Sequence, residues 1–315
     1  MQTRISLAPL QGLTDFIFRN TYNKFFTGID VAYSPYIRIE RGDIRRSKLR
    51  DIEPENNNGI KLIPQILTNN TEEFIFLAKH ICELGYNEIN WNLGCPFPMV
   101  ARHNLGSGML NNPTQIDDIL STVLKAVECK LSIKMRNGYE DENDILTILP
   151  LLEKHNLSEI IIHPRTGIQQ YKGNVNRDIF EKCIPLTKHN LTYNGDINTI
   201  DEYNAFKKQF PNTDSIKLGR GVIANPFLPM DIKDIEIKED RLEIFKQFHG
   251  ELLIGYSELL NGDMQILKRM QGFWEYFSLS FTNSRKVYKK VKKATSAAKY
   301  VNAVSQIFRE EEWIA

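Results

Sequence analysis

The chain has 315 residues, of which 42% are hydrophobic and 25% are charged, and its net charge is +1. This composition is ordinary for a globular protein, the length favours two structural units over one, and the near-neutral charge excludes a chain coated all over by nucleic acid. No stretch of about 18 apolar residues could span a bilayer, and the N-terminus lacks a basic segment followed by an apolar one. We therefore expect a cytoplasmic protein that does not bind a membrane.

Eight short apolar runs, each followed by a turn or cap signal, dominate the first 230 residues. They predict strands over residues 5–8, 31–33, 61–66, 89–92, 131–135, 159–163, 191–194 and 215–218, with helices over 71–81, 113–127 and 143–155 among the connections. Strands that alternate with helices form parallel sheets covered on the outside. Eight such units predict a closed (β/α)₈ TIM barrel over residues 1–230, which fits this repeat count better than a doubly wound open sheet.

The pattern changes after residue 230. A charged stretch over residues 231–240 has no periodicity, and strand signals end there. From Arg241 onward, apolar residues recur at helical spacing, as in Phe245, Phe248, Leu252 and Tyr256, and a last helix is expected through Ala294 to Phe308. We predict a separate all-α helical bundle over residues 238–315.

The cysteines are Cys82, Cys95, Cys129 and Cys183, which lie far apart in the sequence. None forms a C-x-x-C pair, and no Cys/His cluster has zinc spacing. The spacing predicts neither a disulfide framework nor a metal site, and it favours a reducing compartment.

One cysteine stands where a barrel places its chemistry. Cys95 follows the fourth predicted strand in the stretch Asn92-Leu93-Gly94-Cys95-Pro96-Phe97-Pro98. Gly94 permits a sharp turn, and the two prolines stiffen the loop and prevent it from continuing the sheet. The alternative is a small apolar cysteine in the core. The segment Asn104 to Met109 is expected to be a mobile lid that positions Cys95.

Polar residues also follow the other predicted strands, at the end of the barrel where active sites form. They are Gln65, Asn92, Lys134, Arg136, His163, Arg165, Asn194-Gly195-Asp196 and Gly219-Arg220-Gly221. The last two groups predict a phosphate site, because glycines permit close approach and arginine pairs with anions. A cation at Lys134 requires an anionic neighbour, such as the N1–C2=O edge of a reduced flavin. A Schiff-base lysine and a plain salt bridge are the alternatives for Lys134.

Together these residues resemble the tRNA-dihydrouridine synthase family. The matching pieces are Ala8 to Asp15, Asn92 to Pro96, Gly106 and Gly108, Lys134 to Gly138, His163 to Thr166, Gln169, Tyr171, Gly173, Asn194 to Asp196 and Gly219 to Gly221. The resemblance implies an enzyme in which NADPH reduces FMN, the reduced flavin transfers hydride to C6 of a uracil in tRNA, and Cys95 protonates C5.

The resemblance also implies the residues that bind each partner. FMN would be held by Pro9, Leu10, Gln11, Gln65, Lys134, His163, Asn194, Gly195, Asp196, Gly219 and Arg220. The uracil would be held by Asn92, Arg136 and Arg165.

Two basic stretches could bind the phosphates of tRNA. The first contains Arg38, Arg41, Arg45, Arg46, Lys48 and Arg50, and the second contains Arg285, Lys286, Lys289, Lys290, Lys292, Lys293 and Lys299, with Tyr288 and Tyr300 interleaved. No acidic residue interrupts the second stretch, so residues 238–315 are expected to form the tRNA-binding unit. The expected contacts with tRNA are Arg285, Lys286, Lys289, Lys290 and Lys293 of this unit, together with Arg38 of the first stretch. The alternative is a charged helix face that is merely solvated.

Two other functions fit part of this pattern. An FMN-dependent reductase of a free pyrimidine, resembling dihydroorotate dehydrogenases, would use the same barrel but would not need the basic stretch. A non-catalytic RNA-binding barrel would keep the basic surfaces but would not need Cys95 or Lys134. The pattern indicates no obligate protein partner, and it leaves open the target uridine, the preference between NADPH and NADH, and self-association.

Overall fold

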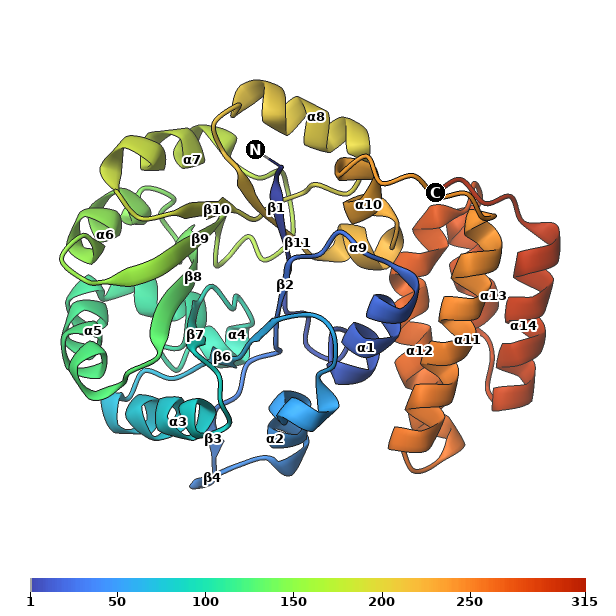
Figure 1. Ribbon diagram of the computed structural model, residues 1–315, viewed down its shortest axis with the longest axis horizontal. Coiled ribbons are helices and arrows are strands. Elements are labelled where there is room, and N and C mark those ends of the chain that lie inside the picture. The colour runs from blue at the N-terminus through green and yellow to red at the C-terminus, as the bar shows by residue number, and fades with distance from the viewer. Residues whose placement is uncertain (1) are drawn as a thin grey trace.

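The computed structural model describes residues 2–315 and confirms the predicted parallel barrel (Figure 1). The strands of its main sheet are β1 (Arg4–Leu7), β2 (Val31–Tyr33), β5 (Leu62–Ile63), β6 (Gln65–Ile66), β7 (Glu88–Leu93), β8 (Lys130–Gly138), β9 (Leu157–Thr166), β10 (Leu191–Tyr193) and β11 (Ser215–Leu218). They pair in the order β5-β2-β1-β11-β10-β9-β8-β7-β6. Every predicted run contains a strand, and β8 and β9 extend beyond the predicted runs.

The barrel closes through the third predicted strand, which Pro64 divides into β5 and β6. Leu62 pairs with Ala32 of β2 on one side, and Gln65 pairs with Asn90 of β7 on the other. Proline has no N–H to donate to a sheet, but the carbonyl oxygen of Pro64 accepts from the backbone N–H of Asn90 at 2.9 Å. Pro64 is therefore the point where the two edges of the sheet meet.

Helices cover the outside of the barrel, because each buries one apolar face against the strands. They are α1 (Phe16–Phe25), α2 (Arg46–Ile52), α3 (Thr71–Glu83), α4 (Pro98–Ala101), α5 (Pro113–Ala126), α6 (Asp144–Leu152), α7 (Arg177–Cys183), α8 (Ile200–Gln209), α9 (Arg220–Ala224) and α10 (Leu228–Ile232). Asp15 caps α1, accepting from the N–H of Phe18. A short hairpin of β3 (Ile39–Glu40) and β4 (Asp43–Ile44) was not predicted from the sequence.

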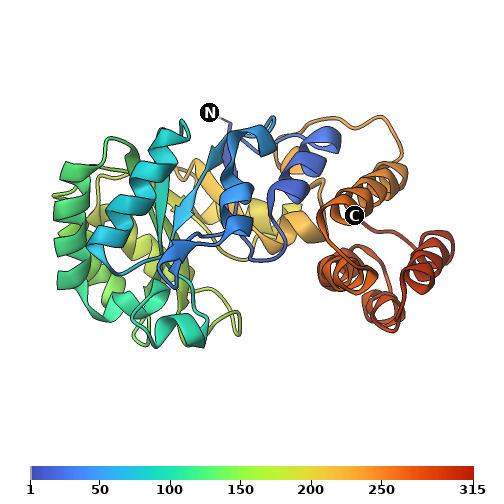
Figure 2. The same cartoon turned by 90° about the horizontal axis from the view of Figure 1, so that it is seen from below.

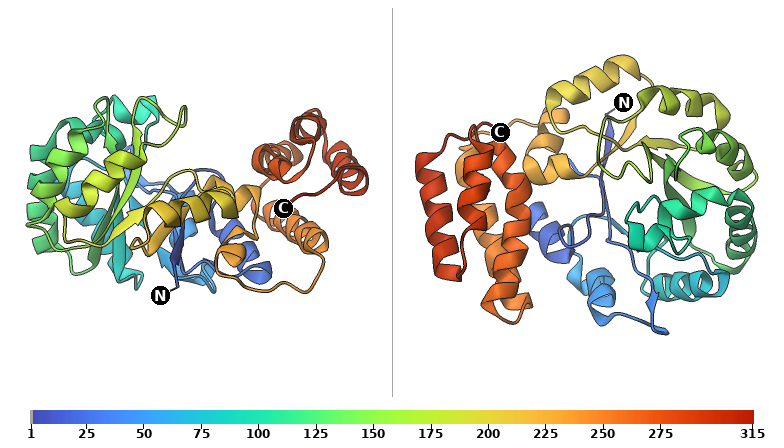
Figure 3. Two further views of the ribbon diagram at one scale, coloured as in Figure 1. Left: turned by 90° about the horizontal axis from the view of Figure 1, so that it is seen from above. Right: turned by 180° about the vertical axis from the view of Figure 1, so that it is seen from behind.

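A helical region follows the barrel and stands beside it (Figures 2 and 3). Its helices are α11 (Arg241–Leu259), α12 (Asp263–Phe277), α13 (Ser284–Lys292) and α14 (Ala297–Glu310). The chain breaks at Lys293 to Ser296, and Ser296 caps α14, so the last helix, which was expected to pass through Ala294, begins only at Ala297. Within residues 2–315, no helix is both long and apolar enough to cross a membrane.

The helical region packs against the barrel through aromatic side chains and one polar cluster. Phe18 of α1 stacks on Phe273 of α12, with 5.7 Å between ring centroids. Asp15 accepts from the hydroxyl of Tyr256 at 2.6 Å and from the guanidinium of Arg269 at 2.8 Å. Asp15 lies in the loop between β1 and α1, so its bonds to Tyr256 and Arg269 hold the helical region beside this first loop of the barrel.

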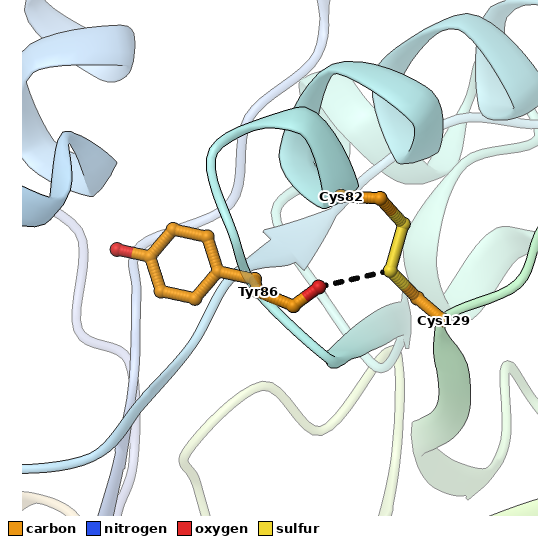
Figure 4. The surroundings of a disulfide bond; sticks show 3 residues. All are labelled: Cys82, Tyr86 and Cys129. Carbon is orange, nitrogen blue, oxygen red and sulfur yellow. Dashed lines mark hydrogen bonds between the residues drawn. A yellow bond between two sulfur atoms is a disulfide. The ribbon is translucent and has the colours of Figure 1, made fainter.

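The prediction that the chain contains no disulfide was wrong, because Cys82 and Cys129 are bonded (Figure 4). Cys82 lies near the end of α3 and Cys129 just before β8, and their Cα atoms are 6.3 Å apart. The Cys129 sulfur also lies 3.0 Å from the carbonyl oxygen of Tyr86. Sequence spacing did not show this pairing, because β7 and β8 are neighbours only in the folded sheet.

Candidate active site

A cavity of about 1440 Å³ opens at the ends of the barrel strands. Cys95 lines it, as do most of the other residues predicted for the site, namely Pro9, Leu10, Gln11, Gln65, Asn92, Lys134, Arg136, His163, Arg165, Asp196 and Arg220. A smaller inner pocket shares several of these residues and adds Asn194, Gly195 and Gly219. The outer wall comes from the helical region, through Glu275, Tyr276 and Leu279. The predicted site residues of the barrel therefore meet in one place.

The loop that carries Cys95 is fixed by Asn92 and Arg136. The side-chain oxygen of Asn92 accepts from the backbone N–H of Gly94 at 3.0 Å and of Cys95 at 2.8 Å. Nε of Arg136 donates to the carbonyl oxygen of Gly94 at 3.1 Å, and Nη1 donates to the carbonyl oxygen of Thr166 at 2.7 Å. Asn92 and Arg136 were predicted to hold a substrate. In the structure, both side chains form hydrogen bonds that hold the cysteine loop in place.

A buried chain of side-chain amides supports Asn92 from below. Nδ2 of Asn92 donates to Oε1 of Gln65 at 2.6 Å, and Nε2 of Gln65 donates to Oδ1 of Asn90 at 2.7 Å. Nδ2 of Asn90 donates to the hydroxyl of Ser132 at 3.0 Å. Gln65 and Asn90 are fully buried. Buried polar groups are costly unless paired, so this chain gives the cysteine loop a defined position.

The segment after the cysteine loop packs beneath it. Ser107 donates to the carbonyl oxygen of Cys95 from its backbone N–H at 3.0 Å and from its hydroxyl at 2.9 Å. Gly106 has a φ of +58°, and a Cβ there would lie 2.7 Å from the same oxygen. This segment is buried from Gly106 to Leu110. It positions Cys95 as expected, but as a packed support instead of an exposed lid.

The surroundings of Cys95 keep its thiol protonated. Burial raises the pKa of Cys95, while the backbone N–H of Phe97, the side chain of Tyr36 and the charges of Arg136 and Lys134 oppose part of this rise. The net pKa is above the ordinary value of a cysteine. A thiol with a raised pKa carries its proton at neutral pH, so Cys95 can act as a proton donor.

Lys134 and His163 stand deeper in the cavity. Burial and the charge of Arg136 lower the pKa of Lys134 to about 7. Burial and the nearby cations lower the pKa of His163 well below its ordinary value, so the imidazole is neutral. Nη1 of Arg165 lies 3.2 Å from Nε2 of His163, and because arginine can only donate, Nε2 is the acceptor and Nδ1 carries the proton.

Asp196 binds two arginines at the inner end of the cavity. It forms two hydrogen bonds with Arg165, and Nη2 of Arg220 donates to its Oδ1 at 2.8 Å. Burial alone would raise the pKa of Asp196, but the hydrogen bonds and charges of these arginines hold it below its ordinary value. Arg165 also donates to the carbonyl oxygen of Gly173 at 2.7 Å. Both terminal nitrogens of Arg165 thus have protein partners, whereas its buried Nε has none within residues 2–315, and Arg220 is the more exposed of the two arginines.

Comparison with known proteins agrees with this geometry. Residues 6–313 match the family model described as dihydrouridine synthase. The chain belongs to the dihydrouridine synthase family. Members of this family are flavin-dependent oxidoreductases, so the family resemblance and the prediction of an enzyme are confirmed.

Individual relatives are distant but match over much of their length. The tRNA-dihydrouridine(16) synthase of Neisseria meningitidis serogroup B is 26% identical over 322 residues, which cover 98% of this chain and 96% of the relative. The tRNA-dihydrouridine synthase B of Pasteurella multocida is 29% identical over 229 residues, which cover 72% and 68%.

Solved structures share the fold. A variant of NCR from Zymomonas mobilis aligns with a TM-score of 0.52 and 14% identity over 77% of this chain and 90% of the other. Morphinone reductase aligns with a TM-score of 0.52 and 14% identity over 75% and 87%. At these identities the similarity shows only the barrel fold.

The charges of the inner pocket fit a flavin of this family. Among the described residues that line it, Asp196 is the one acid, whereas Lys134, Lys217 and Arg220 are basic. The side-chain nitrogen of Lys217 is buried and has no hydrogen-bond partner within residues 2–315, and burial lowers the pKa of Lys217 well below its ordinary value. A surplus of desolvated basic groups favours an anionic ligand, such as a phosphate or the ring of a reduced flavin, because an anion stabilises their protonated forms. Within the same range, no cluster of three His, Cys, Asp or Glu side chains could hold a metal ion.

The basic surfaces lie outside this cavity and are partly neutralised. Arg38 donates to Glu40 at 3.0 Å beside the small hairpin. On the helical region, Lys286 pairs with Glu311 at 2.7 Å and Lys290 with Glu310 at 3.4 Å. Acids at the C-terminal end of α14 therefore face a basic stretch that contains no acid of its own.

The rest of the α13 surface remains basic. Arg285, Lys289, Lys292 and Lys293 are exposed and have no ion pair within the described part of the chain. Tyr300 is not on this surface, because it is buried and bonded to His249 and Trp274.

Three cavity residues were missing from the predicted site. Tyr36 follows β2 and lies near Cys95, Tyr171 lies between the guanidinium groups of Arg136 and Arg220 at 5.4 and 4.9 Å from its ring centroid, and Lys217 projects from β11. Tyr36 stands just past a predicted strand, so the same strand-end rule could have identified it. Tyr171 lies in the loop after β9 and was named among the residues that match the family, but it was given no role, and Lys217 lies inside an apolar run and had no local signal.

Proposed function

We propose that this chain reduces uridines in tRNA to 5,6-dihydrouridine, using FMN as its flavin and NADPH as the source of electrons. The supporting observation is the Cys95 thiol, which is kept protonated and held by Asn92 and Arg136 at the mouth of a cation-lined pocket. The relatives named as tRNA-dihydrouridine synthases make tRNA the favoured substrate.

The chemistry assigned to the protein is acid catalysis and charge stabilisation. When bound, the reduced flavin supplies the hydride that adds to C6 of the uracil. Cys95 donates its proton to C5, which a thiol of raised pKa can do at neutral pH. Lys134 and Arg136 stand where they could stabilise negative charge on a uracil carbonyl oxygen as the proton moves. A base must leave its stack to enter this cavity, which costs less in a tRNA loop than in a duplex.

The residues proposed to hold FMN span the main cavity and the inner pocket. Gln11 and Gln65 line the main cavity alone, where the ring would lie, and Asn194, Gly195 and Gly219 line the inner pocket alone, where the phosphate would lie. The residues that line both are Pro9, Leu10, Lys134, His163, Asp196 and Arg220. Gln65 is fully buried with both ends of its amide in use, so only its remaining N–H is free for a ligand.

We assign FMN and catalysis to residues 1–230 and tRNA binding to residues 238–315. Arg285, Lys286, Lys289, Lys290 and Lys293 are the proposed phosphate contacts there, with Arg38 on the barrel. Ion pairs with acids weaken the case for Lys286, Lys290 and Arg38. The wall formed by Tyr276 makes the helical region part of the entrance to the cavity as well. Because tRNA is a cytoplasmic substrate, we place the enzyme in the cytoplasm.

One anaerobic experiment tests this function. The purified protein, loaded with FMN, is followed by absorption as NADPH and then unmodified tRNA are added. We expect NADPH to bleach the flavin spectrum and tRNA to restore it, with dihydrouridine appearing in the tRNA by mass spectrometry. Restoration by free uracil or orotate would instead support the free-pyrimidine reductase, and failure to bind FMN would exclude the flavin chemistry proposed here.

A further inference from the structure

Lys217 is a lysine inside the barrel that the chemistry described so far does not use. Its neighbours on β11, Ile216 and Leu218, belong to the main core, which includes the covering helices, so alternation along the strand points Lys217 to the interior. Its side-chain nitrogen lies 2.9 Å from the centroid of the ring of Tyr33, which is part of a separate small apolar cluster inside the barrel. The whole residue is 1% exposed.

This lysine lacks the partners that a buried basic group normally has. Its nitrogen has no hydrogen-bond partner within residues 2–315. Glu159, an acid inside the barrel, is occupied by other groups, since it accepts from Arg4 at 2.7 Å, from the hydroxyl of Tyr33 at 2.6 Å and from that of Thr192. Burial lowers the pKa of Lys217 well below its ordinary value, and the charge of Glu159 opposes only part of this fall. An unpaired buried amine destabilises a fold, so its presence indicates a functional role.

The position of the nitrogen indicates what this role is. Lys217 lines the inner pocket, which is continuous with the main cavity because Pro9, Leu10 and Lys134 line both. From β11 the side chain passes the inner face of β1 and reaches Tyr33 of β2, the next strand but one. It therefore leads away from the glycine loops after β10 and β11, and toward the strand end that carries Pro9 and Leu10. This position favours an effect on the flavin ring over one on its phosphate.

We propose that Lys217 is a tuning residue for the flavin, whose ammonium stabilises through space the negative charge that the ring carries once it is reduced. The inference rests on the proposed function in one respect, the presence of a flavin in this cavity. Because protein atoms cover the nitrogen, we assign it no direct bond to the ring. In a poorly polarisable interior, one charge acts strongly over several ångströms.

The charge balance needs no further reactant. NADPH delivers a hydride, which is two electrons and one proton, so the neutral oxidised ring gains one negative charge. Lys217 takes one proton from solvent as that charge appears, because an adjacent anion raises the pKa of a lysine. No bond to the flavin forms or breaks at Lys217. The phosphate has the same charge in both states of the ring, so a cation that paired with the phosphate would not distinguish them.

The deciding experiment measures the midpoint potential of bound FMN in the absence of tRNA. Wild type and Lys217→Met, each loaded with FMN, are reduced anaerobically together with a reference dye, and both absorption spectra are followed. We expect Lys217→Met to bind reduced FMN about tenfold more weakly relative to oxidised FMN, which lowers a two-electron potential by about 30 mV. The matched control is Lys233→Met, since the side chain of Lys233 is 8% exposed but pairs with Asp30 at 2.7 Å and lines neither pocket. Its potential should match wild type.

The stability of the unloaded protein gives a second readout with opposite signs in the two variants. Lys217→Met replaces an unpaired buried amine with an apolar side chain of similar length, so the midpoint of urea unfolding should rise. Lys233→Met should lower that midpoint, because Asp30 loses its partner. A fall in Lys217→Met as large as that in Lys233→Met would make Lys217 a structural residue and overturn the inference.

A third variant separates charge from hydrogen bonding. Lys217→Gln is neutral but keeps a hydrogen-bonding side chain opposite Ser6 of β1, whose buried hydroxyl also has no partner in the described part of the chain. It should lower the potential as much as Lys217→Met does. A lowered potential in Lys217→Met alone would assign the effect to hydrogen bonding or packing and overturn the inference, as would equal potentials for Lys217→Met and wild type. The proposed function is judged separately, by dihydrouridine formation in tRNA, which none of these measurements uses.

Discussion

The cavity of the barrel and the basic surface of α13 use polar residues in opposite ways. In the cavity, Gln65, Asn92 and Arg136 are at most 7% exposed, and each is held by hydrogen bonds to its neighbours. On α13, Lys289 and Lys292 are exposed and have no ion pair in the described part of the chain. A buried network depends on individual atoms, whereas exposed charges act additively and are screened by salt. Changes in the two regions should therefore differ in size and in salt dependence.

The largest effect is expected at the reacting group. Cys95→Ala should lower dihydrouridine formation in tRNA at least 100-fold, since a positioned general acid contributes about 10²–10⁴ in rate. Nucleoside mass spectrometry of the tRNA measures this rate, and flavin content should stay as in wild type. Cys183→Ala, which changes a buried cysteine of α7 away from the cavity, is the matched control. Equal rates for Cys95→Ala and wild type would remove Cys95 from the mechanism.

A pH-dependent effect is expected deeper in the cavity. The pKa of Lys134 is about 7 in the protein alone, and bound FMN, which carries an anionic phosphate and whose ring presents carbonyl oxygens that accept from an ammonium, would raise that pKa. Above pH 7, binding must then take up a proton, so the Kd for FMN should rise by up to about tenfold per pH unit between pH 7 and 9.

Quenching of FMN fluorescence by the unloaded protein measures this Kd. Lys134→Met cannot take up a proton, so it should bind FMN weakly and with little pH dependence over this range. A Kd that does not vary with pH in wild type would show that Lys134 does not pair with the flavin.

A smaller, salt-dependent effect is expected on α13. Replacing Lys289, Lys292 and Lys293 with Gln should weaken tRNA binding about threefold to tenfold and reduce the slope of log K against log salt by up to about three, one for each lost phosphate contact. Filter binding at several salt concentrations measures both quantities. The matched control replaces Lys79, Lys125 and Lys130, which are exposed on the outside of the barrel. Equal losses in the two variants would mean that α13 has no special role.

The smallest effect is expected for a paired charge of the same surface. Lys286 is exposed and forms an ion pair with Glu311 at 2.7 Å. The ammonium of Lys286 is solvent-exposed and screened, although the Glu311 side chain is only 3% exposed. Lys286→Ala should therefore lower the Tm by at most about 2 °C, as measured by thermal circular dichroism. A clear fall in Tm would show that this pair holds α13 against the C-terminal end of the chain.

Much of the barrel could be predicted because strand and cap signals are local. The runs 31–33 and 215–218 match β2 and β11 residue for residue, since a short apolar run bounded by turn residues has few alternatives. The predicted residues of the cavity also came together, because the parallel topology brings the ends of all strands to one face. Helix ends within the basic stretch were less accurate, since Lys293 to Ser296 carry no strong breaker.

By itself the sequence determined the alternation of strands and helices, the strand-end residues and the family, because each of these depends on local patterns and their order. Only the tertiary structure decided which side chains meet. The bond between Cys82 and Cys129 and the ion pairs of Lys286 with Glu311 and of Lys290 with Glu310 join residues that are separated in the chain. Such contacts depend on which strands and helices become neighbours, and packing of the whole chain determines that.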